Sequence, residues 1–207
     1  MFKPEEREYR NFTLEIKEDN EDYIVEGYAS TYVPYTLYKD EKQEWREQID
    51  PHAFDEADLK DVVFLLDHAG RCYARTKNGT LTLSVDDKGL FTRADLSKTS
   101  SAREVFEDIK VGNYSQMSFA FTVGDDAYDE RTDENGVRVI TRTITKIVKC
   151  WDVSGVIRPA NPSTDIGVAT RAAFDGAIEA FDGAIKEREA AKNERARQAL
   201  ALKLKIS

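Results

Sequence analysis

Short runs of alternating apolar and polar residues occupy most of the first two-thirds of this 207-residue chain. Side chains that alternate with a period of two lie on opposite faces of a strand, so this pattern favours half-buried β-strands. Turn residues separate the runs, which are 12–17, 22–31, 79–86, 89–96, 115–123, 137–148 and 151–157. Residues 62–66 instead form a continuous apolar run, as expected of a strand that is buried on both faces. The sequence therefore predicts a mainly β fold.

The same region is expected to contain a few peripheral helices. One begins at Thr99 or Ser100, either of which is a suitable N-cap, and ends near Val111 before a Gly-Asn pair. A second helix is expected to start at Asp50-Pro51, with the aspartate as N-cap and the proline in the first turn. Loops are expected in the polar segments 35–47 and 124–136.

The character of the chain changes near Ala172. Phe174-Asp175-Gly176-Ala177-Ile178 recurs seven residues later as residues 181–185, which places the large apolar residues on one helical stripe. The remainder is rich in Ala, Glu, Lys and Arg, which are good helix formers. We therefore expect a domain of residues 1–170 and a tail of residues 171–207 that forms an amphipathic helix. This helix would either cover the domain or dock on a partner.

Composition excludes several classes of function. The formal net charge of -9 argues against nonspecific binding to nucleic acid or to an anionic membrane. The cysteines, Cys72 and Cys150, show no zinc-like spacing and are expected to be reduced, and no glycine-rich phosphate loop occurs. No metal or cofactor is predicted. The charged N-terminus and the lack of a long apolar run predict a soluble intracellular protein.

Two residues are candidates for a nucleophile and its base. Ser118 lies in a strand-like segment whose apolar face holds Met117, Phe119, Phe121 and Val123. The opposite face is small and polar, which would leave room in front of a serine hydroxyl. His68 directly follows an apolar strand, and a serine needs a base such as histidine to remove its proton near neutral pH. The ordinary alternatives are a packed serine and a solvated histidine.

Asp152 is the candidate for a third group that orients the histidine. It lies within an apolar strand-like segment, where a carboxylate needs a cation or a hydrogen-bond donor. The ordinary alternative is an aspartate on an edge strand that faces water. Cys72 offers a rival nucleophile because it is close to His68 in sequence, and a cysteine hydrolase would use either Cys72 or Cys150.

Six blocks of the chain together resemble the prohead maturation proteases of tailed bacteriophages, whose fold is similar to that of the herpesvirus assemblin proteases. The order and spacing of the blocks agree from about residue 10 to residue 170. Three positions depart from the family pattern: Asp152 stands in place of the usual glutamate, and His52 and Ala120 each stand in place of a glycine. The blocks are Val25–Ala29, Ile49–Phe54, Leu65–His68, the hairpin Asn78–Leu81 with Lys88–Leu90, Gly112–Phe121, and Asp152–Ser154 with Pro159–Pro162.

The resemblance implies an antiparallel β-barrel, closed or nearly closed, and a serine endopeptidase. Ser118 would be the nucleophile, His68 the general base and Asp152 the orienting acid, and the loop at Ile157 and Arg158 would supply an oxyanion donor. The implied substrate is the scaffolding portion of the major capsid protein, cut inside the prohead in the host cytoplasm, together with the protease itself. Self-association as a dimer stays open.

The competing hypothesis is a catalytically inactive barrel that serves as a capsid assembly or scaffold-binding module. The aspartate at position 152 would be its first sign, whereas the presence of both His68 and Ser118 speaks against it. A cysteine hydrolase is a third hypothesis.

Overall fold

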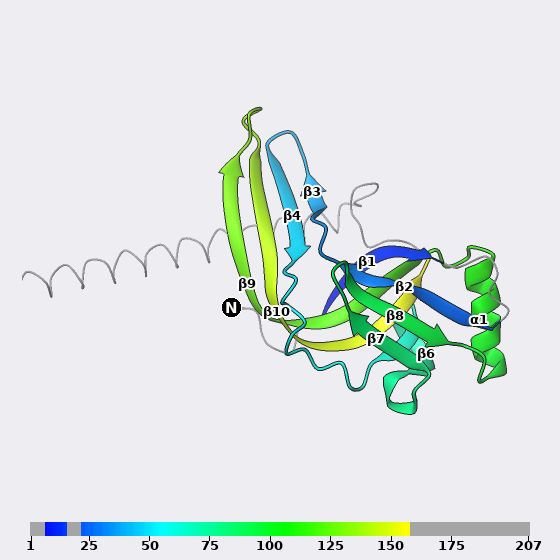
Figure 1. The fold of residues 1–207 in the computed structure, drawn as a ribbon. Helices are drawn as coiled ribbons and strands as arrows, with labels where there is room; N and C mark the ends of the chain where they lie inside the picture. Colours follow the sequence, from blue (N-terminus) through cyan, green and yellow to red (C-terminus); the bar gives the residue numbers. More distant parts are fainter. Residues whose placement is uncertain (1–6, 16–21, 158–207) are drawn as a thin grey trace, which may run out of the picture. The chain divides into compact units, whose positions relative to one another are not determined.

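The computed structural model describes residues 7–15 and 22–157. These residues form ten strands, one α-helix and one short 3-10 helix, so the mainly β prediction is confirmed (Figure 1). In chain order the elements are β1 (Glu8–Glu15), β2 (Ile24–Thr31), β3 (Tyr35–Lys39), β4 (Gln43–Ile49), β5 (Val63–Leu66), β6 (Ala69–Arg75), η1 (Thr76–Asn78), β7 (Leu81–Val85), β8 (Gly89–Asp95), α1 (Ser100–Lys110), β9 (Gln116–Thr132) and β10 (Arg138–Val156).

The ten strands form one sheet with the order β3-β4-β10-β9-β1-β2-β8-β7, and β5 joins β10 to β6. The expected closed barrel is not found. Although η1 links β6 to β7, no ladder pairs them among the described residues, so the sheet stays open at that point. Two of the pairings, β10 with β4 and β10 with β5, are parallel. Barrel closure depends on which edge strands meet, and the period of a single strand carries no information about that.

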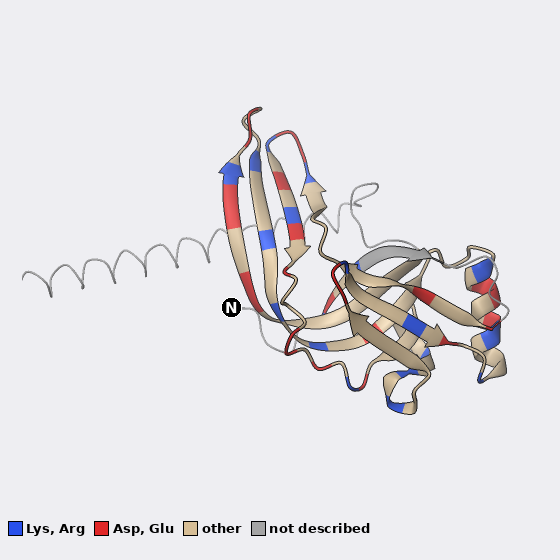
Figure 2. Ribbon diagram, in the orientation of Figure 1, with Lys and Arg blue, Asp and Glu red and all other residues tan. Residues whose placement is uncertain are grey.

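The longest ladder joins β9 and β10, which pair antiparallel along almost their whole length. Their outer halves combine with β3 and β4 into a four-stranded arm, here defined as residues 35–49 and 124–146 (Figure 1). Both segments expected to be loops, 35–47 and 124–136, therefore lie largely in strands. Their many charged residues suggested loops, but pairs across the arm balance them, such as Arg138 with Glu130 at 2.7 Å (Figure 2).

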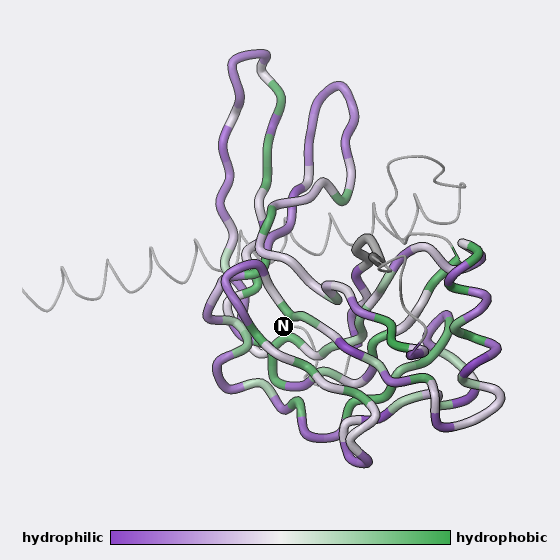
Figure 3. Tube along the Cα trace, turned by 45° about the vertical axis from the view of Figure 1, so that its right-hand side comes forward, coloured by the Kyte–Doolittle hydropathy of each residue, from purple (hydrophilic) through white to green (hydrophobic). Residues whose placement is uncertain are grey.

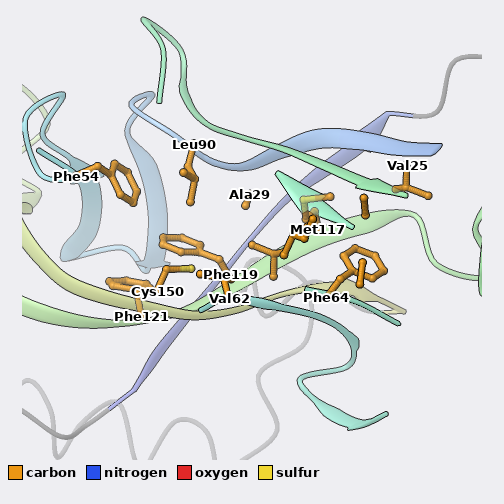
Figure 4. Packing of buried hydrophobic residues seen from close by; sticks show 14 of the residues in the cluster. Val25, Ala29, Phe54, Val62, Phe64, Leu90, Met117, Phe119, Phe121 and Cys150 are labelled. Atoms are coloured by element: carbon orange, nitrogen blue, oxygen red, sulfur yellow. The ribbon is translucent and has the colours of Figure 1, made fainter. Parts of the chain in front are cut away.

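The apolar core lies mainly in the rest of the described fold, called the body, and extends into the base of the arm through Ile49 and Ile144. Met117, Phe119 and Phe121 point from β9 into this core, and the last two rings stack with centroids 4.4 Å apart (Figure 4). Helix α1 begins after Thr99, whose side chain accepts the amide of Ala102, as expected. Figure 3 shows the contrast between the apolar strands of the body and the polar hairpin tips of the arm.

The helix expected at Asp50-Pro51 is absent: residues 51–56 form turns. Asp50 does accept the amide of His52 through its carboxylate, at 2.8 Å. However, the carbonyl of Ala53 accepts a hydrogen bond from the amide of Ile147 on β10. This carbonyl is therefore not available for the hydrogen bond that a continuing helix would form with it. The predicted tail helix and the domain boundary at 170 lie outside the described residues. No helix of the described part is long and apolar enough to cross a membrane.

A cluster of buried ion pairs joins β1 to the base of the arm. Arg142 on β10 donates to Glu8 at 2.7 Å, to Glu47 at 3.0 Å and to Asp126 at 2.9 Å. Arg10 on β1 donates to the same two glutamates. The side chain of Glu47 has no exposed surface. Burial raises the pKa of Glu8, but the hydrogen bonds and charge of Arg142 outweigh it, so this pKa lies below its usual value.

Replacing Arg142 by methionine should destabilise the protein by about 3–5 kcal/mol, because the buried Glu47 and the partly buried Glu8 and Asp126 would each lose a charged donor. The matched control is Arg138→Met, which removes a partly exposed ion pair from the same strand and should cost about 1 kcal/mol or less. Urea unfolding of both variants measures the difference. Equal decreases in the free energy of unfolding for the two variants would show that the cluster contributes no more to stability than a surface ion pair.

Candidate active site

The ladder between β9 and β10 places the candidate polar residues on one face. Ser118 lies directly opposite Ser154, and Asp152 lies opposite Ala120. Because residues two apart in a strand share a face, the side chains of Ser118, Ser154 and Asp152 lie together. An extra residue in β10 between Cys150 and Asp152 interrupts the ladder just before the aspartate.

His68 reaches this face from a tight turn between β5 and β6. Leu66 pairs with Ala69, so Asp67 and His68 are the only residues of the loop. Both have positive φ, 45° and 57°, a conformation that two-residue hairpins favour and that Asn-Gly usually fills. The turn is attached to β10, because the amide of Asp67 donates to the carbonyl of Gly155 at 3.0 Å.

The three predicted residues form a hydrogen-bonded row. Nδ1 of His68 is 2.6 Å from Oδ1 of Asp152, and Nε2 is 2.6 Å from Oγ of Ser118. A carboxylate can only accept, so the proton of the neutral imidazole belongs on Nδ1, which leaves Nε2 to accept the serine hydroxyl. This is the protonation state that a general base needs before it activates a hydroxyl.

Ser154 is a member of the site that the sequence analysis did not single out. Its hydroxyl donates to Oδ1 of Asp152 at 2.8 Å, the same oxygen that His68 binds. The side chain has no exposed surface, and Asp152 is only 3% exposed. A buried carboxylate is costly unless donors satisfy it, and here two donors do so. The sequence did contain a pattern that could have identified Ser154, since it follows Asp152 by two residues in a strand and so shares its face.

Tyr9 on β1 is a second neighbour that the sequence did not reveal. Its ring contacts the imidazole of His68 edge-on, with centroids 4.5 Å apart and planes at 64°. Only the pairing of β1 with β9 brings it there, through the register of Tyr9 with Ala120. The two hydrogen bonds engage the ring nitrogens of His68, and the contact with Tyr9 adds packing against the imidazole ring.

The small polar face does not leave open space in front of the serine. Ser118 has no exposed surface, and its neighbours Ala120 and Thr122 are buried as well. The side chain of His68 is 17% exposed. The expectation of an open face was therefore wrong for this conformation: alternation identified the face but could not show what packs against it.

The segment expected to supply an oxyanion donor is described only at its start. The amide of Ile157 donates to Oδ1 of Asp67 at 3.2 Å. Arg158 lies outside the described residues. The carboxylate of Asp67 thus connects the His68 turn to the end of β10, and the Ile157 amide is already engaged.

Neither cysteine has the surroundings of an activated thiol. Burial raises the pKa of Cys72, and its Sγ donates to the carbonyl of Ala74 at 3.1 Å. Burial and then the charge of Asp152 raise the pKa of Cys150, which is fully buried. Since the thiolate is the reactive form, these shifts count against a cysteine nucleophile.

The remaining histidine lies on the surface. His52 is exposed and lies 3.2 Å from Asp55. Within residues 7–15 and 22–157, no group of three His, Cys, Asp or Glu side chains could hold a metal ion.

A serine hydroxyl bound to a histidine that a carboxylate holds is the arrangement of serine hydrolases. The family model of the caudovirus prohead serine proteases matches residues 10–176, and the chain belongs to this family. It is thus a serine protease of the kind that acts in phage prohead maturation. No curated protein and no solved structure matches the chain.

Cys72→Ala and treatment with iodoacetamide should leave proteolysis unchanged within about twofold, because thiols with raised pKa values are mostly protonated near pH 7. Peptide hydrolysis before and after alkylation measures this, and intact mass confirms that Cys72 has reacted. A loss of activity that Cys72→Ala prevents would identify the thiol as part of the site.

Proposed function

We propose that this chain is a serine endopeptidase that cleaves the scaffolding portion of the major capsid protein, and itself, inside the prohead in the host cytoplasm. The observation that carries the proposal is the row Ser118–His68–Asp152, with two contacts of 2.6 Å, in a member of the prohead serine protease family. In the row, both nitrogens of one imidazole are hydrogen-bonded, one to a hydroxyl and the other to a buried carboxylate, which is the order that a general base requires.

The proposed reaction has two halves. Nε2 of His68 takes the proton of Ser118, and Oγ attacks the scissile carbonyl carbon. The tetrahedral intermediate collapses to an ester with Oγ, and Nε2 returns the proton to the leaving amine. In the second half, His68 takes a proton from a water molecule, whose oxygen attacks the ester carbonyl carbon. The acid product then leaves, and Nε2 returns the proton to Oγ of Ser118. Asp152 stabilises the imidazolium through Nδ1–H at each step.

Ser154 has a positioning role in this proposal. Its hydroxyl donates to the oxygen of Asp152 that faces His68, so it restrains the carboxylate and disperses its charge. Asp152 has a shorter side chain than the glutamate of the family pattern. A second donor that fixes its orientation would help it reach the imidazole.

The burial of Ser118 supports a latent free form. A carbonyl carbon can reach Oγ only if the groups that cover it move apart, because the residue has no exposed surface. Capsid or scaffold segments, or a second copy of the chain, would favour the open form by binding to it. Such control suits an enzyme whose early activity would destroy its own assembly.

Ser118→Ala should abolish cleavage when the chain is co-expressed with its capsid protein. We expect the rate to fall about 10⁴-fold or more, because loss of the nucleophile removes the acyl-enzyme route. The intact masses of the protease and of the capsid protein measure both reactions. Ser30→Ala is the matched control, since Ser30 is also a fully buried serine and its hydroxyl has no partner in the described structure.

Discrete fragments with wild type and Ser30→Ala, and none with Ser118→Ala, would support the proposal. If every chain stays whole while capsids still assemble, the inactive assembly module becomes the better explanation. Identical cleavage by all three would remove the nucleophile assignment from Ser118.

Ser154→Ala should lower kcat about tenfold with little change in KM, which corresponds to roughly 1.4 kcal/mol of transition-state stabilisation. The reason is that Asp152 loses a donor, whereas the surface that meets the substrate is unchanged. The Ser30→Ala variant again provides the comparison, with melting temperatures measured for both. A fall in melting temperature with unchanged kcat would show that Ser154 has only a structural role.

A further inference from the structure

Trp151 marks a second polar site on the same face as the proposed catalytic residues. It is the extra residue of β10 that follows Cys150 and precedes Asp152. Its indole N–H donates to Oγ1 of Thr122 at 2.9 Å. Thr122 lies on the Ser118 face of β9, two residues beyond Ala120. The bulge therefore turns the indole toward the row of residues that contains the nucleophile.

Two cations lie against this ring. The guanidinium of Arg7 is 4.3 Å from the ring centroid, and the ammonium of Lys149 is 4.6 Å from it. Both distances are within the range of a cation–π contact. The site formed by Arg7, Lys149, Trp151 and Thr122 is called the Trp151 site below.

The charge of the Trp151 site is not balanced. Lys149 has a carboxylate partner, Asp58, at 3.1 Å. Arg7 is exposed, and among the described residues no carboxylate pairs with it. The site thus carries a net positive charge on a chain whose formal net charge is -9. An aromatic face holds the guanidinium in place but leaves its N–H groups free to bind an anion.

Its distance from Ser118 suits a peptide substrate. Thr122 is four residues from Ser118 along β9, which at about 3.3 Å per residue is roughly 13 Å. An extended peptide has nearly the same rise per residue. In the open form proposed above, in which the groups that cover this face have moved apart, a substrate that lies along it with its scissile bond at Ser118 would bring a side chain about four residues away to the Trp151 site.

We propose that the Trp151 site is a specificity subsite that binds an aspartate or glutamate side chain of the substrate, about four residues from the scissile bond. This inference rests on the proposed protease function. The guanidinium of Arg7 pairs with the substrate carboxylate, the indole of Trp151 packs against its methylene groups, and Lys149 adds positive charge. The site thereby selects acidic segments of the capsid protein or of the protease itself.

The test uses random ten-residue peptides in which one position at a time is fixed as Glu, Gln or Lys. The full chain cleaves each pool, and mass spectrometry locates the cut relative to the fixed residue. We expect Glu to exceed Lys in kcat/KM by 10-fold or more at one position about four residues from the cut. Arg7→Gln should remove this preference, and Arg7→Glu should reverse it. Arg131→Gln, which changes an exposed arginine at the far end of β9, should retain it.

Equal cleavage of Glu, Gln and Lys pools at every position would overturn the subsite while leaving the protease function intact. So would a preference that Arg7→Gln does not change. A separate measurement covers the case in which no peptide is cut. The Ser118→Ala chain is titrated by calorimetry with a Glu-containing pool and a Lys-containing pool. Tighter binding of the Glu pool that Arg7→Gln abolishes supports the subsite, and equal binding overturns it.

Discussion

The antiparallel pairing of β9 with β10 is the constraint on which the rest of the structure depends. Its register places Ser118 opposite Ser154 and sets Asp152 two pairs further along, opposite Ala120. The other edge of β10 takes β5 in parallel, and this brings the turn with His68 to the same face. A shift of one residue in the ladder would turn these side chains to the core face, where Phe119 and Phe121 stack. The same ladder continues outward as the arm, so site and arm share one pair of strands.

The N-terminal strand ties these two regions together. One face of β1 presents Tyr9 to the imidazole of His68, and the other presents Glu8 and Arg10 to the buried ion pairs at the base of the arm. Polar groups are buried on both sides of this strand, and each side satisfies them differently. At the candidate active site, one carboxylate accepts hydrogen bonds from two neutral side chains, an imidazole and a hydroxyl. At the base of the arm, three carboxylates pair with two arginines. Displacing β1 would therefore disturb both regions at once.

The sequence predicted what depends on local pattern. Alternation identified the face of β9 that carries Ser118, and the end of an apolar strand located His68. The prediction failed where pairing decides the outcome. Residues 124–132 look like an acidic loop, yet they form a strand because β10 supplies a ladder and basic partners. The open edge between β6 and β7, and the contact of Tyr9 with His68, depend on which strands become neighbours. The bulge at Trp151 is likewise visible only in the register of two strands.

The turn that carries His68 also holds backbone strain at the site. A histidine at φ 57° and an aspartate at φ 45° each cost roughly 1–2 kcal/mol relative to glycine in the same conformation. Asn-Gly in these two positions would relieve the strain but would remove both the carboxylate and the imidazole. The structure instead retains an energetically unfavourable pair whose imidazole meets Ser118 and whose carboxylate holds Ile157. Under the proposed protease function, this strain is already present in the folded protein before any substrate binds, so the base does not have to be positioned during the reaction.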